Sequence, residues 1–235
     1  MAQELIAIKT PITKEEAIRA LWHGWLAFFG APPPKKECIW LLTAQWGLET
    51  GWGKSMWNYN FGNVKSIDGD GHDYQFFACN EILDTGHAEQ LQEASPQTVK
   101  VVPYKSLGKS VVWFYPKHPG CRFRAFADAA AGATDHISLV NRRFSKAWPS
   151  VLTGDPQTYA KALKAQGYYT ADEYEYMKGL VGCYNMAAKA QIDYTTLDVL
   201  TASDVEHLQA LVGMSLQSSL ASIFETYDDD DYDTV

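Results

Sequence analysis

Strand-like sequence in this chain is confined to one block, and helical patterns lie on both sides of it. Residues 74–126 contain short runs rich in β-branched and aromatic residues: YQFFACNEIL, TVKVVPYK, VVWFYP and RFRAF. Such runs are typical of strands in a small sheet. Between the first two, DTGHAEQLQEASPQ predicts a polar loop or a short helix. A small antiparallel β lobe set apart from the helices predicts an α+β fold that is mainly helical.

Capping signals delimit the helices on either side of this block. Thr13-Lys-Glu-Glu16 is a capping box that predicts a helix to about Phe29, closed by Gly30 and three prolines. A second helix is expected from about Lys35 to Glu49, followed by a loop over residues 50–73. Later helices are expected at about 128–143, from Asp155 to before Gly167, from a capping box at Thr170 to about Lys189, and from another at Ser203 to about Phe224.

The length of 235 residues allows one good-sized domain with an extension. We expect the domain to cover residues 1–190 and a C-terminal helix with an acidic tail to cover 191–235, with a joint at about 191–202.

The net charge of −8 argues against a general nucleic-acid binder. Charge is unevenly distributed, because residues 225–235 hold six acids and no base, whereas residues 97–148 hold nine Lys and Arg against two Asp. The basic stretch could face an anionic polymer, or it could be an ordinary solvated surface, and the sequence leaves both open.

Targeting and metal-binding signals are weak. MAQELIAIKTP does not read as a secretory signal and no window has the length of a membrane span, so we expect synthesis in the cytoplasm without a signal peptide. The four cysteines lack CxxC pairs, which favours free thiols, with a Cys79–Cys121 bridge as the alternative. DGDGHD at 68–73 lacks the Gly and Glu of a calcium loop and predicts a turn. No metal and no cofactor is predicted.

A single carboxyl group, Glu49, stands out in AQWGLETGWGKSMWNYNFGNVK at residues 44–65. Leu42 and Trp46 lie on nearly the same helical face and should be buried, so Glu49 emerges from an apolar stripe at a helix C-terminus. Burial and the negative end of the helix dipole both disfavour the anion and raise the pKa of Glu49. A carboxyl that stays protonated is suited to general acid catalysis at a glycosidic oxygen. An exposed glutamate on a frayed turn would show the same local pattern.

The loop after Glu49 carries groups that suit a sugar. Trp52 and Trp57 offer flat faces for stacking, and Asn60 and Asn63 offer paired donors and acceptors. The alternative interpretation is that the aromatic residues belong to the core and the asparagines form turns.

LETGWGKS followed by NYNFGNVK resembles the ALESGWGKS…NNLFGIK signature of glycoside hydrolase family 73. RFRAFADAAAGATDHISLV and DPQTYAKALKAQGYYTADEYEYMKGL resemble two later family segments, in the same order, so the resemblance covers roughly residues 14–185. These family members are peptidoglycan N-acetylglucosaminidases with a lysozyme-like fold, some of them flagellar or phage-borne. The resemblance therefore implies a lysozyme-like domain that cleaves the β-1,4 bonds of wall glycan strands.

Family roles carry over to matching positions. The resemblance implies that Glu49 is the general acid, that Glu81 in ACNEIL is the second carboxylate, and that Tyr168 binds substrate or a nucleophilic water. Tyr174 matches a later family tyrosine and is expected to bind substrate. A carboxylate separation of about 5 Å would indicate retention of configuration, and about 6.5–9.5 Å inversion.

Two departures affect the expected shape of the cleft. Ala171-Asp172 replaces the family's Asp-Pro, and the stretch from Ile82 to Val112 is longer than the usual β insert.

The sequence is compatible with three rival functions. A lytic transglycosylase or a muramidase could use the same fold, the transglycosylase without a second carboxylate, and a non-catalytic glycan-binding particle protein is a third possibility. We expect the protein to act on the cell wall, delivered by a phage or a phage-like injection particle that binds its C-terminal helix.

Overall fold

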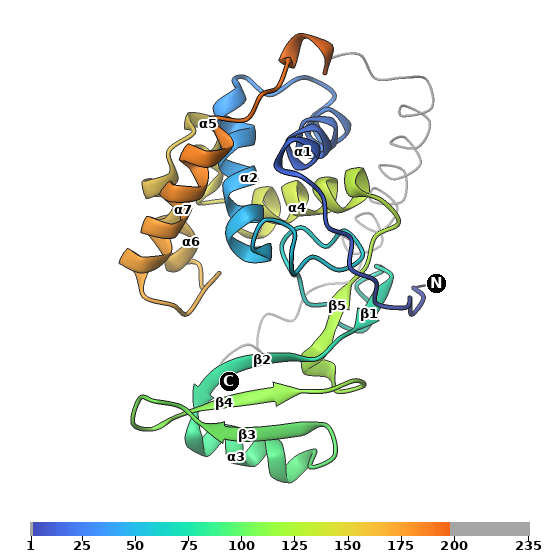
Figure 1. Cartoon of the computed structure of the whole chain (residues 1–235), viewed down its shortest axis with the longest axis vertical. Helices are drawn as coiled ribbons and strands as arrows, with labels where there is room; N and C mark the ends of the chain where they lie inside the picture. The colour runs from blue at the N-terminus through green and yellow to red at the C-terminus, as the bar shows by residue number, and fades with distance from the viewer. Residues whose placement is uncertain (1, 198–235) are drawn as a thin grey trace, which may run out of the picture.

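The computed structural model describes residues 2–197, which form a helical lobe and a smaller β lobe (Figure 1). The helical lobe contains α1 (Lys14–Phe29), α2 (Lys36–Thr50), α4 (Ala129–Arg143), α5 (Trp148–Thr153), α6 (Pro156–Ala165) and α7 (Glu173–Ala187). The β lobe contains β2 (Cys79–Asp84), α3 (Thr85–Ala94), β3 (Val99–Pro103) and β4 (Lys109–Phe114). Strands β1 (Tyr74–Phe76) and β5 (Arg122–Arg124) pair between the lobes, and two short 3-10 turns are η1 (Pro119–Cys121) and η2 (Tyr194–Thr196). The predicted α+β class is confirmed.

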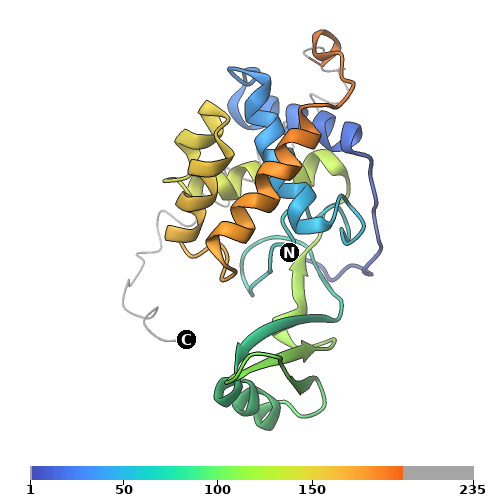
Figure 2. The ribbon, with the colours of Figure 1, turned by 60° about the vertical axis from the view of Figure 1, so that its left-hand side comes forward.

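Helix α2 is the central element of the helical lobe. It packs against α1, α5 and α7, and every residue from 41 to 47 is buried. The sequence predicted one buried stripe, but a helix surrounded by other helices is apolar on all sides. Its C-terminal end lies on the face of the helical lobe that is turned toward the β lobe (Figures 1 and 2).

The sheet of the β lobe is antiparallel, with strand order β2-β4-β3. One face packs on α3, where Ala88 contacts a core that includes Val99, Val112 and Phe114. The alternate residues lie on the other face, which no element covers in the described part of the chain. Strand β2 is the edge strand nearest the helical lobe (Figure 1).

Stacked rings and an ion pair hold the two lobes together. The Trp57 ring stacks on Phe77 at 5.2 Å, and Phe77 stacks on Phe123 of β5 at 4.1 Å. Arg124 of β5 donates to Asp135 of α4 at 2.8 Å, which ties the strand pair to the helical lobe. Because both contacts are at least partly shielded from water, they fix the lobes more firmly than surface ion pairs would.

Most predicted elements are found, with three differences. The strand-rich block forms two separate sheets instead of one. DTGHAEQLQEASPQ contains helix α3, which agrees with the short helix that was one of its two predicted states. Helix α7 begins after Asp172, whose side chain accepts from the Glu175 backbone, so the predicted capping box at Thr170 is wrong. Helix α5 was missed because six residues are too few to show a helical period. The predicted helix from Ser203 and the acidic tail lie outside the described residues.

The domain extends beyond residue 190. Tyr194 accepts a hydrogen bond from the Trp40 indole at 2.8 Å, and Leu197 is buried in the core of the helical lobe. The predicted boundary at 190 therefore falls too early, and a truncation should spare residues up to Leu197.

The four cysteines are free thiols, as expected, so the alternative Cys79–Cys121 bridge is not formed. Between residues 2 and 197, no helix is long and apolar enough to span a bilayer, and no group of His, Cys, Asp and Glu side chains could hold a metal ion.

Gly132 of α4 offers a test of the packing between α4 and the loop after α2. A Cβ at this position would lie 1.9 Å from the Tyr59 carbonyl oxygen. We expect Gly132→Ala to destabilise the protein by about 3 kcal/mol, because backbone must move to relieve the overlap. The measurement is denaturant unfolding.

Gly182→Ala in α7 is the matched control, since a Cβ there meets nothing within 4 Å. We expect it to be neutral or to stabilise by up to about 1 kcal/mol, as Ala replaces Gly in a helix. Equal stability of the two variants would contradict the packing described here.

Candidate active site

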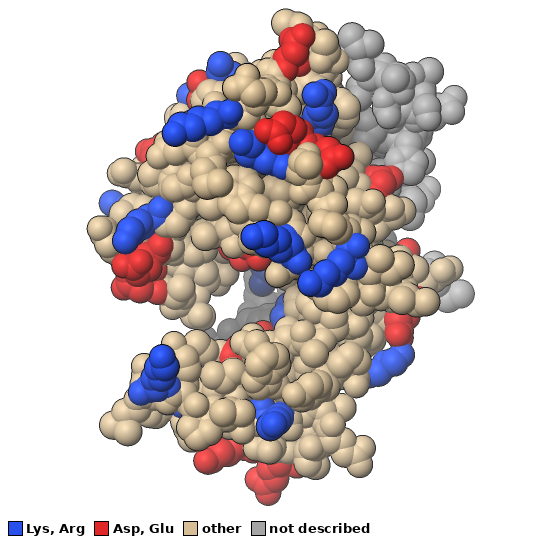
Figure 3. Space-filling view, in the orientation of Figure 1, with Lys and Arg blue, Asp and Glu red and all other residues tan. Residues whose placement is uncertain are grey.

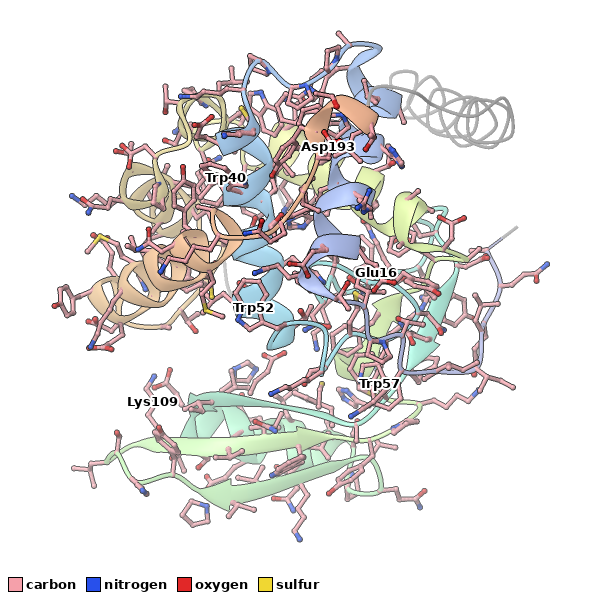
Figure 4. The ribbon with its side chains drawn as sticks, turned by 45° about the horizontal axis from the view of Figure 1, so that its top comes forward. Glu16, Trp40, Trp52, Trp57, Lys109 and Asp193 are labelled. Atoms are coloured by element: carbon pink, nitrogen blue, oxygen red, sulfur yellow. The ribbon has the colours of Figure 1, made fainter. Side chains whose placement is uncertain are left out.

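Helix α2 brings Glu49 to the side of the helical lobe that faces the β lobe. The helix ends at Gly51, which adopts φ 57°, a left-handed conformation that glycine tolerates best. Trp52 then folds back, and its ring lies over Gly47, where an added Cβ would come within 3.1 Å. The turn therefore depends on two glycines of the sequence motif, and it fixes the direction of the last helical turn. Figure 3 shows that the molecule is hollowed between the two lobes, and Figure 4 shows Trp52 at the helical edge of this gap.

Two side chains from distant segments hold Glu49 in place. The Tyr176 hydroxyl on α7 donates to Glu49 Oε1 at 2.9 Å. The Asn63 amide donates to the Glu49 backbone carbonyl at 2.9 Å, which satisfies one of the free carbonyls at the helix end. The carboxyl and the backbone of Glu49 are thus both fixed.

Burial dominates the electrostatics of Glu49 and raises the pKa of its carboxyl, while the hydrogen bond from Tyr176 lowers it by a smaller amount. Within residues 2–197, Glu49 has no ion pair. The direction agrees with the prediction from the sequence. A carboxyl group in this setting is protonated over a wider pH range than an exposed glutamate.

Tyr168 lies within the electrostatic influence of this carboxyl. It follows Gly167, a residue with φ 73° that ends the α6 segment, and its ring packs edge-on against Phe144. Burial and then the charge of Glu49 raise the pKa of the Tyr168 hydroxyl, so it remains a neutral donor. Its predicted contact with substrate or water stays a prediction.

Tyr176 was missed by the sequence analysis, which selected Tyr174 instead. Tyr174 is 63% exposed at the start of α7, whereas Tyr176 contacts Glu49. Residues two apart on a helix point in different directions, so only one of them can face α2. The spacing of Tyr176 and Leu180, both on the side of α7 that packs against the helical core, could have identified it.

Glu81 lies on edge strand β2, and its partner is Lys65. The Lys65 ammonium lies 3.2 Å from Glu81, whose side chain is 45% exposed. Lys65 also lies 3.5 Å from the Cys79 sulfur and 4.3 Å from the centre of the Phe123 ring. Glu81 makes no hydrogen bond with Glu49 in the described part of the chain, and its catalytic role stays a prediction.

The loop residues divide into two groups. Asn60 is 1% exposed and its amide bonds the backbones of Val64 and Arg124, so it holds the loop together and has no free group for a sugar. That corrects its assignment to substrate binding. Trp57 stacks on Phe77 and holds the joint between the lobes (Figure 4). Trp52 and Asn63 are partly exposed beside Glu49 and remain candidates for contact with substrate.

The stability of the protein should depend on the ionisation of Glu49. Its raised pKa means that the folded state binds the proton more tightly than the unfolded chain, so stability falls as pH rises from about 4.5 through the raised pKa. Glu49→Gln keeps an acceptor for Tyr176 and does not ionise. We therefore expect this variant to exceed the wild type in stability at pH 8 and to match it near pH 4, with about 1.4 kcal/mol for each unit of pKa difference.

Urea unfolding at several pH values measures this difference, and Glu175→Gln, an exposed acid on α7, is the control. If the stability difference between Glu49→Gln and the wild type does not change with pH, the pKa of Glu49 is not raised in the folded protein.

Comparison with known proteins identifies the family. A glucosaminidase family model, described as mannosyl-glycoprotein endo-beta-N-acetylglucosaminidase, matches residues 40–189, which is more than half of the chain. Among solved structures, the chain is similar to the catalytic domain of the autolysin Auto from Listeria monocytogenes, with 14% identity, a TM-score of 0.40, and coverage of 77% of this chain and 89% of that one. That likeness is too distant to support a further assignment, and no curated protein matches the chain. On the family match, the chain belongs to the glucosaminidases of glycoside hydrolase family 73, which confirms the resemblance found in its sequence.

Proposed function

We propose that this glucosaminidase hydrolyses the β-1,4 bond on the reducing side of N-acetylglucosamine in peptidoglycan, with Glu49 as the general acid. The observation that carries the proposal is the largely buried Glu49 carboxyl, which has a raised pKa and a hydrogen bond from Tyr176 beside the gap between the lobes. The family membership supports the reaction class.

The hydrogen bond from Tyr176 also decides which oxygen carries the proton. Glu49 Oε1 accepts from the Tyr176 hydroxyl, so the acidic proton is better placed on Oε2. Glu49 then transfers this proton to the bridging oxygen as the glycosidic bond breaks. Asn63 contributes by holding the backbone of the acid, which makes it a positioning residue.

Glu81 would act on the other side of the bond, either by activating water or by stabilising the oxocarbenium ion. Its ion pair with Lys65 joins the exposed edge strand β2 to the loop that follows α2. Movement of β2 toward the helical lobe, together with Lys65, would bring the second carboxylate to the sugar. Tyr168 would then bind substrate or the attacking water between them.

A lytic transglycosylase is the second candidate, and the position of Glu81 is the observation that favours it. A carboxylate that is 45% exposed and paired with a lysine does not have to take part in the reaction. In a transglycosylase the muramyl 6-hydroxyl attacks intramolecularly, so Glu49 alone would suffice.

Residues 198–235, which contain the predicted docking helix, lie outside the described residues, and delivery by a phage or an injection particle stays a prediction. Truncation after Leu197 should leave glycan cleavage intact, because the core of the helical lobe is retained.

Product analysis tests the reaction. Purified peptidoglycan is digested, reduced with borohydride and analysed by mass spectrometry, with a high-mannose glycoprotein as a parallel substrate. We expect reduced N-acetylglucosamine ends from peptidoglycan, and Glu49→Gln should lower the rate about 10²- to 10⁴-fold, the range for loss of a general acid.

Each other product contradicts the proposal in its own way. Reduced muramic ends would indicate a muramidase. Anhydro-muramyl ends, together with a Glu81→Gln variant that keeps nearly full activity, would indicate a transglycosylase. Cleavage of the glycoprotein alone would show that the substrate is a glycoprotein glycan and not peptidoglycan. Equal and negligible cleavage by wild type and Glu49→Gln would indicate a binding protein.

Tyr176→Phe tests the orientation of the acid. Loss of the hydroxyl removes the bond that lowers the pKa of Glu49, so the high-pH limb of kcat/KM should move to higher pH. We expect kcat/KM at its optimum to fall about tenfold, as the hydrogen bond is worth roughly 1.5 kcal/mol. Tyr184→Phe, on the same helix with its ring against Trp40, is the control and should behave as wild type. An unshifted pH profile in Tyr176→Phe would remove Tyr176 from the mechanism.

A further inference from the structure

The open face of the β-lobe sheet carries an ordered grid of side chains. Residues that pair across β2, β4 and β3 point to the same face, so the register places Asn80, Trp113 and Lys100 in one row. The next row contains Ile82, Val111 and Val102. Helix α3 covers the opposite face and is drawn behind the sheet in Figure 1, so the grid faces the viewer.

This grid is exposed although much of it is apolar. Ile82 is 47% exposed, Val102 38% and Trp113 37%. No described element packs on these three side chains, and adjoining apolar groups of this kind on a protein surface usually mark an interaction site. In the view of Figure 3 this side of the β lobe is mostly uncharged, with isolated basic groups and with acidic groups at its lower edge.

The charged side chains of β3 and β4 are all basic. Residues 94–127 contain no Asp or Glu, although the whole chain has a net charge of −8. Lys109 pairs with Asp84 of β2 at 2.9 Å, whereas Lys100 has no ion pair in the described part of the chain. Lys100 is therefore available for an anionic partner, and it stands in the same row as the exposed indole.

We propose that this open face is an auxiliary binding site for a carboxylate-bearing aminosugar polymer, separate from the position of Glu49. The row of Asn80, Trp113 and Lys100 spans about 10 Å, from two inter-strand spacings, which is long enough for more than one sugar ring. The indole of Trp113 stacks on the apolar face of a sugar, the Asn80 amide bonds an acetamido group, and the Lys100 ammonium pairs with a carboxylate. The choice of polymer rests on the proposed function.

A second copy of the chain is a less suitable occupant. A two-fold contact through this face would bring a second Lys100 to it, whereas its acid, Asp84, already pairs with Lys109 and β3 and β4 contain no other acid. A glycan that carries carboxylates provides the missing charge.

The test separates binding from catalysis. The full chain with Glu49→Gln, which should not digest the substrate, is sedimented with purified sacculi and with chitin, an aminosugar polymer that lacks carboxylates. We expect Trp113→Ala to weaken binding to both polymers about five- to tenfold. Lys100→Gln should weaken binding to sacculi about threefold at low salt and leave chitin binding unchanged.

Matched controls lie on the helical lobe. Leu152→Ala is an exposed apolar change on α5 and Lys161→Gln an exposed lysine change on α6, and neither should alter binding. In the active protein, Trp113→Ala should slow digestion of sacculi but keep wild-type kcat/KM on a short soluble glycan.

Undiminished binding of Trp113→Ala to both polymers would overturn the proposal, and so would an effect of Trp113→Ala on the oligomeric state alone, which would show a contact between copies. Failure of the proposed function has a different signature, since the wild type would then release no reduced N-acetylglucosamine ends whatever Trp113→Ala does.

Discussion

The burial of most of the Glu49 carboxyl, for which no residue from 2 to 197 provides a pairing cation, is the interaction on which the rest of this structure depends. Taking an ionised Glu49 out of water is costly, and the protein reduces that cost by keeping the group protonated and by one hydrogen bond from Tyr176. The position requires a central helix that ends at the right place, and α2 provides it because other helices surround it along its length. The burial of Glu49 lowers the free energy of unfolding when the carboxyl is ionised, and it keeps the carboxyl protonated over a wider pH range.

The β lobe lies opposite the end of α2 that carries Glu49 (Figures 1 and 2). The stacked rings at the joint and the pair between Arg124 and Asp135 hold the β lobe beneath the end of α2. Glu81 lies on edge strand β2 and Lys65 lies in the loop after α2. Small movements of such segments cost little free energy. The acid is thus fixed and its predicted partner is held less tightly, which is the arrangement expected if substrate binding completes the site.

The sequence analysis predicted the features that depend on neighbouring residues. The end of the helix beside Glu49 and the glycine turn after it follow from residues within a few positions of one another. The raised pKa also requires the helices that pack around α2. Tyr176 contacts Glu49 across 127 positions, and the family pattern pointed to Tyr174. The helical spacing of Tyr176 and Leu180 favours Tyr176, but it does not indicate that the residue in contact is Glu49. Asn60 was misassigned because composition cannot separate an asparagine that bonds its own loop from one that is free to bind a sugar. At the start of α7, two overlapping capping signals competed, and the structure uses Asp172.

Direct titration of Glu49 tests the central claim. Carboxyl NMR of selectively 13C-labelled protein, with Glu49→Gln used to assign the signal, reports the pKa of this one group. The account predicts a single Glu49 titration with a pKa above the ordinary value of 4.5, the direction set by burial. A Glu49 pKa at or below 4.5 would contradict it, because the carboxyl would then be ionised near neutral pH and could not donate the proton.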